Sequence, residues 1–433
     1  MSKGKRVLAM ILTGVLTVSM LAGCGEKEKD EPKSEGKTEL TFMSVGGANE
    51  EAFTGLIEAA ADKFNQENKY NAEIKLEWYE NEQYKTKLAT LMTQNDVTDI
   101  FFTWEAGFMK DYVESGKVAS LTSALEGDSE WKDRFNDGVF DAVTFQEDIY
   151  AVPMGQALVP LYYNKQIFKD NKVEVPTTWE EFLEAIKTFR EAGITPISMA
   201  SQDAWVSGMM MLELSGGIGG KELFDDIVAG KTTWDDERYI ETGKTFQELI
   251  NAGAFPEGFL GLSYDEGRVL FTSGEAAMYP MGTWETPAII EGMDGAENVG
   301  VFLQPAKNEQ YKDTRTATIE KLFSVSEKCE NKEAAFAFLK LLSDPEIQEK
   351  YVTECGGLPA TKVQIEASKV DEVTAAIMDL QKSVVNPLTA MDRQFGANVG
   401  GEFNNISVAI AGGADVLEQF ASLQVYALQE AEQ

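Results

Sequence analysis

Beyond residue 38 the apolar positions follow strand and helix periods in turn. Glu39–Val45 and Ala72–Tyr79 alternate apolar and polar residues, and Asp99–Trp104 is a short apolar run typical of a strand buried on both faces. Glu50–Asn65 and Gln83–Thr93 instead repeat their apolar residues at helical spacing. This strand–helix–strand–helix–strand order predicts a doubly wound α/β layer.

The pattern changes near residue 150. The passage IYAVPMGQALVPLYYNKQIF is apolar and aromatic and contains two prolines, which indicates a segment that crosses between two bodies rather than a surface loop. Thr178 and Glu181 have the spacing of a capping box, so a helix is expected to begin there and to bury Trp179.

The second half is predicted to be mainly helical. NVGVFLQPA at 298–306 is expected to be another crossing strand, and SGGIGGKE at 215–222 a flexible turn. Breaks are expected at Pro387 and at glycines 396, 400 and 401. The other helices are predicted at Trp205–Leu214, at Tyr239–Ala252, at Asn331–Ser343, and from Pro345 to Gly356-Gly357 with Asp344 as the cap.

Length, charge and composition exclude several classes of function. A chain of 433 residues exceeds what one hydrophobic core usually serves, so two lobes are expected. The formal net charge of −34 argues against nucleic acid as a partner and disfavours anionic ligands. The sequence has no histidine, which excludes Ser-His-Asp and Cys-His catalysis and most zinc sites. No cofactor is expected, and since no EF-hand spacing occurs, no metal ion is expected either.

The N-terminus has the pattern of an export signal. Three basic residues precede the apolar stretch Val7–Met20, which is too short to span a membrane. Leu21-Ala22-Gly23-Cys24 then resembles the lipobox of bacterial lipoproteins, in which the cysteine is acylated and becomes the first residue of the mature chain. We therefore expect a lipoprotein signal peptide at 1–23, lipidation by palmitate at Cys24, and a flexible tether at 24–38.

Two further cysteines, Cys329 and Cys355, flank a predicted helix pair. In an exported protein they could form a disulfide. Two free buried thiols are the alternative, and the spacing leaves both open.

Four longer segments match the pattern of one known family. TDIFFTWEAG fits D-I-x-x-W, and YAVPMGQALVPLYYNKQIFKDNKVEVPTTWEEF fits A-x-P…L-x-Y-N-K-x-x-F…P-x-T-W-E-E-F. FTSGEAAMYPMGTW fits F-x-x-G-x-x-A-M-x-x-x-G-x-W, and NKEAAFAFLKLLSDPEIQEKY…GGLPA fits a helix pair followed by a turn. On these segments the chain resembles the extracellular solute-binding proteins of carbohydrate ABC importers, the maltose-binding-protein-like family. The resemblance extends from about Glu39 to Ser422.

This resemblance implies an α/β fold of two lobes, each a mixed sheet flanked by helices, which close on a ligand by hinge bending. The first lobe would comprise 39–155 and 297–353, and the second 156–296 and 354–433. The protein would be a monomeric receptor, not an enzyme, that captures a neutral mono- or oligosaccharide for the permease subunits of an ABC transporter. The lipid would anchor it on the extracellular face of the cell membrane of a Gram-positive bacterium, which has no outer membrane to retain it.

Aromatic and acidic side chains near strand ends are the candidates for ligand binding. Trp104 and Trp284 follow predicted strands, where open α/β sheets place their sites, and glycines around Trp284 favour its outward presentation. An aromatic ring covers the C–H face of a sugar, while carboxylate, amide and guanidinium groups bind its hydroxyls. The candidates, several given only by position in the resemblance, are Trp284, Trp104, Trp205, Glu105, Asp203, Glu285, Asn49, Glu50, Glu80, Gln156, Asp392, Arg393 and Phe395.

Other functions stay open at this point. Two carboxylates could hydrolyse a glycosidic bond, although no pair stands out among 72 acidic residues. The same fold could bind a polyol, a peptide or an amino acid, although an amino acid would need an arginine or a helix N-terminus for its carboxylate. A phosphate loop at 215–222 is excluded, because Ser215 and Glu222 stand where its motif requires glycine and serine or threonine.

Overall fold

The computed structural model describes residues 37–47 and 50–432. The predicted signal peptide, the lipidation site Cys24, nearly all of the tether, and Asn49 lie outside the described residues, so what was expected of them stays a prediction. Within the described part of the chain, no helix is both long and apolar enough to cross a membrane.

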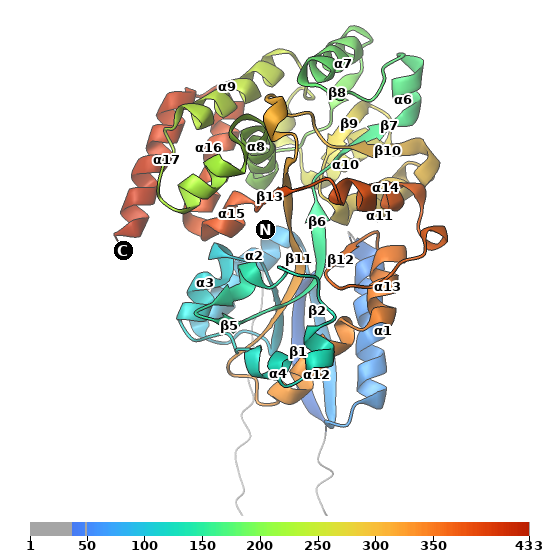
Figure 1. The fold of residues 1–433 in the computed structure, drawn as a ribbon, viewed down its shortest axis with the longest axis vertical. Helices are drawn as coiled ribbons and strands as arrows, with labels where there is room; N and C mark the ends of the chain where they lie inside the picture. The colour runs from blue at the N-terminus through green and yellow to red at the C-terminus, as the bar shows by residue number, and fades with distance from the viewer. Residues whose placement is uncertain (1–36, 48–49, 433) are drawn as a thin grey trace, which may run out of the picture. The chain divides into compact units, whose positions relative to one another are not determined.

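The larger of two main sheets has the strand order β12-β6-β11-β3-β1-β2, and β13 also pairs with β11 (Figure 1). Strands β2, β1 and β3 are parallel, which confirms the predicted α/β layer, while β11 runs antiparallel to β3 and β6. The strands are β1 Thr38–Val45, β2 Ala72–Tyr79, β3 Ile100–Thr103, β6 Val152–Leu158, β11 Thr314–Val325, β12 Leu358–Pro359 and β13 Asn386–Leu388.

The smaller sheet has the order β10-β7-β9-β8. Its strands are β7 Leu161–Asn164, β8 Thr195–Ile197, β9 Ala276–Pro280 and β10 Val299–Phe302; a separate hairpin pairs β4 Thr144–Phe145 with β5 Asp148–Ile149. Only Val159 and Pro160 separate β6 of the larger sheet from β7 of the smaller one, as the crossing predicted near residue 150 requires. Strand β10 pairs with β7, which favours placing it with the second lobe; the lobe limits themselves stay a prediction.

Helices flank both sheets, and the buried apolar side chains form two clusters, one around each sheet (Figure 1). This arrangement confirms the predicted fold class. The helices near the larger sheet are α1 Glu51–Glu67, α2 Asn81–Gln94, α3 Gly107–Glu114, α4 Thr122–Glu126, α5 Ser129–Lys132, α12 Lys332–Leu342 and α13 Pro345–Thr353. The others are α6 Lys165–Asp170, α7 Trp179–Glu191, α8 Ala204–Val228, α9 Glu237–Asn251, α10 Tyr264–Thr272, α11 Thr286–Gly292, α14 Glu372–Gln381, α15 Met391–Gln394, α16 Gly396–Ala411 and α17 Val416–Ala431.

Local signals at helix starts are largely confirmed. Thr178 and Glu181 form both hydrogen bonds of the capping box, and Trp179 is buried behind them. Asp344 occupies the N-cap position of α13, but its carboxylate makes no capping bond and pairs with Arg134 instead. The prediction is therefore confirmed for the N-cap position of Asp344 but not for a capping hydrogen bond from its side chain.

The glycine-rich segment 215–222 is not a flexible turn; that prediction is wrong. It lies within α8, whose two helical parts meet at a kink at Gly220, where φ is +66°. A Cβ at Gly216 would lie 2.8 Å from Leu388 Cδ1, and one at Gly217 would lie 3.2 Å from the Ala306 Cα. The glycines are there because neighbouring chain segments pack directly against the helix.

The two cysteines of the described residues are free and buried, so the alternative to a disulfide is confirmed. Burial raises the pKa of each thiol to about 12. Both thiols therefore stay protonated at neutral pH and behave as small apolar side chains.

Two adjacent glycines of α16 provide a test of how closely chain segments pack against helix glycines. Breaks predicted at Gly400 and Gly401 are wrong, since α16 runs through both. A Cβ at Gly400 would lie 2.2 Å from the Met391 carbonyl oxygen, whereas a Cβ at Gly401 would meet nothing within 4 Å. We expect Gly400→Ala to lower the free energy of unfolding by about 1–3 kcal/mol, and Gly401→Ala to raise it by about 0.4–1 kcal/mol. Urea unfolding of both variants checks this, and equal effects would contradict it.

Candidate functional site

A central cavity lies between side chains from the two sheets and their helices. Its empty volume is about 1090 Å³, open mouth included. Five aromatic side chains, Phe102 among them, and charged groups of both signs line it. The lining from elements of the larger sheet includes Glu50, Glu80, Lys85, Trp104, Glu320 and Lys321; that from the other elements includes Asp203, Trp205, Met209, Tyr264, Trp284, Glu285, Asp392, Arg393 and Asn404.

Trp284 reaches the cavity from a short turn after strand β9. Thr283–Glu285 form a single 3-10 turn that leads into α11. A Cβ at Gly282 would lie 2.1 Å from the Trp284 ring, so only glycine leaves room for the indole to fold back over its own chain. The φ of Gly282 is −69°, an ordinary value, so the glycine provides space here and not an unusual backbone turn.

A chain of hydrogen bonds holds the Trp284 indole. Trp284 Nε1–H donates to the Tyr264 hydroxyl at 2.9 Å, and this hydroxyl donates to Glu285 Oε1 at 2.6 Å. Arg268 Nη1 lies 3.2 Å from Glu285 Oε2. Burial raises the pKa of Tyr264 well above its usual range, and the charge of Glu285 adds to this effect, so the hydroxyl remains a donor. The indole orientation is thus fixed by protein groups, of which Tyr264 and Glu285 also line the cavity.

The aromatic lining is distributed over both walls. Trp205 lies 5.4 Å from Tyr264 and 6.3 Å from Trp284 between ring centroids, and the three rings form one cluster. Trp104 comes from the end of β3, packs edge-on against Phe102 and has Lys85 Nζ 5.6 Å from its ring centroid. Each wall therefore offers an indole surface to the cavity.

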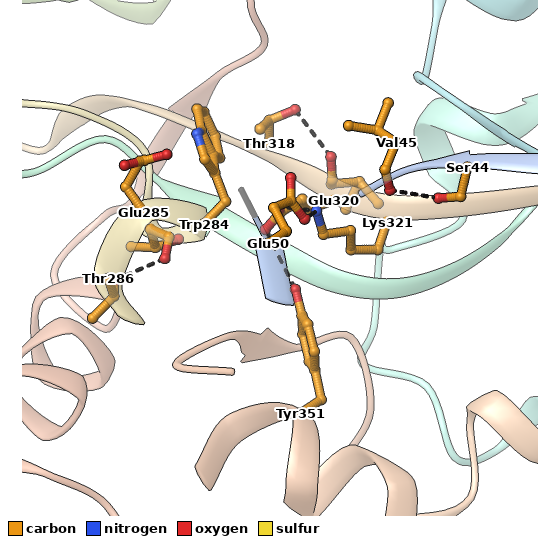
Figure 2. A network of polar contacts seen from close by, with 12 residues as sticks. Ser44, Val45, Glu50, Trp284, Glu285, Thr286, Thr318, Glu320, Lys321 and Tyr351 are labelled. Atoms are coloured by element: carbon orange, nitrogen blue, oxygen red, sulfur yellow. Dashed lines mark hydrogen bonds and ion pairs between the residues drawn. The ribbon is translucent and has the colours of Figure 1, made fainter. Parts of the chain in front are cut away.

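A buried group of charges forms another part of the wall (Figure 2). Lys321 Nζ pairs with Glu50 and lies 3.3 Å from Glu320 Oε1. The side chains of Lys321 and Glu320 are only 5% and 7% exposed. Burial lowers the pKa of Lys321, but attraction to the two carboxylates outweighs it and the net shift is upward; burial raises the pKa of Glu320. The ammonium is therefore kept charged by its neighbours.

Carboxylates at two helix starts line the cavity. Glu80 caps α2, accepting from the amides of Glu82 and Gln83. Asp203 stands at the start of α8, but its side chain makes no capping bond to that helix. Partial burial raises the pKa of Asp203, and the charges of Glu82 and Glu80 raise it further. Asp203 is thus better placed to accept a hydrogen bond from a ligand than to stabilise its own helix.

The structure brings nine of the thirteen predicted site residues to the cavity. These are Trp284, Trp104, Trp205, Asp203, Glu285, Glu50, Glu80, Asp392 and Arg393. Asn49 lies outside the described residues.

Three predicted residues lie elsewhere, because their side chains are used in packing or pairing. Glu105 is 1% exposed and contacts Thr318 and Arg393. Gln156 lies in β6 and accepts from Gln381 at 3.2 Å, and Phe395 packs against Trp234.

Sequence reasoning missed Tyr264, Lys85, Glu320 and Lys321. Tyr264 is the first residue of α10, directly after the capping serine Ser263, so an aromatic residue next to a capping box was an available signal. Glu320-Lys321 stands between the apolar residues Ile319 and Leu322 of the strand TRTATIEKLFSV, and adjacent opposite charges flanked in this way indicate a buried pair. No cluster of potential metal ligands occurs among the described residues.

Comparisons with known proteins place the chain in one family. The family described as bacterial extracellular solute-binding protein matches residues 47–349, more than two thirds of the chain. An uncharacterized ABC transporter extracellular-binding protein of Pyrococcus horikoshii is 24% identical over 93% of this chain and 92% of its own. The multiple sugar-binding protein of Streptococcus mutans is 23% identical over 80% of each chain.

Two solved structures are similar over nearly their whole length. One, from work on xylan utilization by the thermophilic bacterium Caldanaerobius polysaccharolyticus, has a TM-score of 0.83 at 29% identity and covers 89% of this chain and 99% of its own. A chitin oligosaccharide binding protein has a TM-score of 0.84 at 24% identity and covers 91% of this chain and 99% of its own. The latter likeness supports the fold alone.

The hydrogen-bond chain behind Trp284 is tested by Tyr264→Phe, which keeps the ring and removes the hydroxyl. The indole N–H and the Glu285 carboxylate each lose a partner, so we expect the free energy of unfolding to fall by about 1–3 kcal/mol. Tyr279→Phe is the matched control: Tyr279 is also buried, and its hydroxyl has no hydrogen-bond partner among the described residues. Urea unfolding should show little change or slight stabilisation for the control, and equal losses would refute the role of the Tyr264 hydroxyl.

Proposed function

Since this chain belongs to the bacterial extracellular solute-binding protein family, we propose that it captures a neutral mono- or oligosaccharide in the central cavity and delivers it to the permease of an ABC importer. The observation that supports this most directly is the pairing of indole surfaces on both walls with carboxylates around them. A sugar ring has C–H faces and an edge of hydroxyls, and this lining suits both.

The charge of the lining favours a neutral ligand. Six carboxylates, those of Glu50, Glu80, Asp203, Glu285, Glu320 and Asp392, stand against three cations, Lys85, Lys321 and Arg393. A uronate would add a negative charge to an already acidic wall, whereas hydroxyls donate to carboxylates without adding charge.

Capture would proceed by closure of the two lobes on the ligand. Arg393, from α15, donates to Thr318 Oγ1 at 2.8 Å and to the Ile319 carbonyl at 3.1 Å, both in β11. Such contacts beside the cavity link the C-terminal helices to the larger sheet. Ligand contacts made only in the closed form would shift the population toward it, and the closed form would dock on the permease.

Two of the similar proteins named above are consistent with a sugar ligand. The Streptococcus mutans relative is a multiple sugar-binding protein, and the structure with 29% identity comes from work on xylan utilization. The chemistry of the cavity lining and the similarity to these two proteins therefore both favour an oligosaccharide of neutral units as the ligand.

A lipid on Cys24 would hold the receptor at the cell surface. In this proposal residues 1–23 are removed on export, and the polar segment that follows is the tether between the lipid and strand β1. A receptor held in this way suits a Gram-positive bacterium and stays close to its permease.

The experiment that decides between a receptor and a glycosidase is calorimetric titration of the full-length protein, purified in detergent, with xylo-, cello- and chito-oligosaccharides. Each mixture is then analysed for cleavage. Saturable binding with intact ligand supports the receptor. Shortened products would favour the glycosidase, and no binding to any neutral sugar would refute the sugar assignment.

Trp284→Ala should weaken binding of whichever sugar binds the wild type by about 1–3 kcal/mol, because the ligand loses an aromatic contact surface. Trp284→Phe should lose less, since a smaller ring remains. Trp179→Phe is the control, because Trp179 is buried in α7 away from the cavity. Calorimetry measures the three affinities, and an unchanged affinity in Trp284→Ala would remove this residue from the site.

Cys24→Ser should abolish lipidation. We expect the wild type to incorporate a labelled palmitate analogue in a Gram-positive host and to fractionate with membranes. The variant should incorporate none and be released from the cells. Equal labelling of the two proteins would refute Cys24 as the acylated residue.

A further inference from the structure

A second cavity adjoins the central one on the far side of Trp284. Its empty volume is about 930 Å³, open mouth included, and Glu50, Trp284, Glu320 and Lys321 line both cavities. The first turn of α1, the first turn of α11 and the end of α13 close it with Phe53, Pro287, Ala288 and Tyr351. Trp284 is thus a partition between two spaces.

The second cavity also combines an apolar side with polar groups. Phe53, Pro287 and Ala288 give it an apolar side, while Lys321 and Glu320 give it buried polar groups. The Tyr351 hydroxyl donates to Glu320 Oε2 at 3.4 Å, so that the carboxylate is oriented from behind (Figure 2). Directional polar groups on an apolar background are what a sugar unit requires.

The backbone at the shared wall is strained. Lys321 has φ +52° although it lies inside strand β11 and is not glycine. Successive side chains of a strand normally point to opposite faces, yet here Glu320 and Lys321 meet at one wall. Lys321 Nζ also lies 4.5 Å from the Phe53 ring centroid. A left-handed residue within a strand persists only where its surroundings hold it, and such residues cluster at ligand sites.

We infer that the second cavity is a further subsite, which takes one more neutral sugar unit of the same linear oligosaccharide that occupies the central cavity. The inference rests on the proposed function and adds chain length to it: the ligand passes the edge of Trp284, and the protein distinguishes longer from shorter oligosaccharides. The second cavity is lined by Glu50, Glu51, Glu291 and Glu320 against Lys321 alone, so a neutral unit is again favoured over a uronate.

Ala52→Phe tests this subsite, because Ala52 is exposed, lies in the first turn of α1, and lines the second cavity only. Ala59→Phe is the matched control: Ala59 is exposed on the same helix and lines neither cavity. Both full-length variants are titrated with the oligosaccharide series that binds the wild type, from the shortest ligand that binds to the hexasaccharide. Thermal unfolding establishes that both are folded.

For the wild type we expect affinity to rise with chain length until the second cavity is filled. Ala52→Phe should bind the shortest ligand as the wild type does and the longest at least about tenfold more weakly, while Ala59→Phe follows the wild type throughout. If Ala52→Phe matches the wild type at every length, the subsite is refuted and the ligand extends, if at all, past Lys85 and Asn404 at the other end. An equal loss at every length also refutes it. Failure of the wild type to bind any sugar would instead overturn the proposed function.

Discussion

The buried ammonium of Lys321 is the constraint on which the site depends. Removing an ammonium from water costs several kcal/mol unless carboxylates stand beside it, and here Glu50 and Glu320 supply them. Glu50 precedes α1 and does not cap it, since its carboxylate is used on the lysine. The start of α1 is thereby tied to β11, the strand that pairs with β3, β6 and β13. The wall shared by the two cavities is therefore positioned before any ligand binds.

The wall around Trp284 is positioned by a different means. There the Tyr264 hydroxyl orients the ring of Trp284, and Glu285 orients the hydroxyl. Glu285 is in turn paired with Arg268. Burial raises the pKa of Glu285, and Arg268 and Tyr264 oppose this shift, so the carboxylate is satisfied by protein groups. Glu285 then serves mainly to position the aromatic surface. The site combines a fixed ionic wall and a fixed aromatic wall, as the two surfaces of a sugar ring require.

Much of the fold could be predicted from the sequence because apolar periodicity and capping are local signals. The range of β2, the start of α7 and the parallel pairing of β1 with β2 and β3 follow from such signals. The segment 215–222 could not be predicted, because its glycines are required by segments that lie far away in the chain, such as Ala306 and Leu388. For the same reason the sequence predicts Glu105 and Phe395 as site residues. Nothing in the neighbouring sequence shows that Glu105 pairs with Arg393 or that Phe395 packs against Trp234.

Selectivity in such a site comes from the few polar groups that the protein leaves for the ligand. Glu80 caps a helix, Glu285 accepts from Tyr264 and Arg268, and Glu50 and Glu320 surround Lys321. These carboxylates are already bound to protein groups, so a ligand hydroxyl uses only their remaining acceptor sites. Asp203 makes no capping bond; partial burial raises its pKa, and the charges of Glu82 and Glu80 raise it further. A hydroxyl that donates to Asp203 relieves this repulsion without adding charge, whereas an anionic group would increase it, so the acidic cavity itself discriminates in favour of neutral ligands.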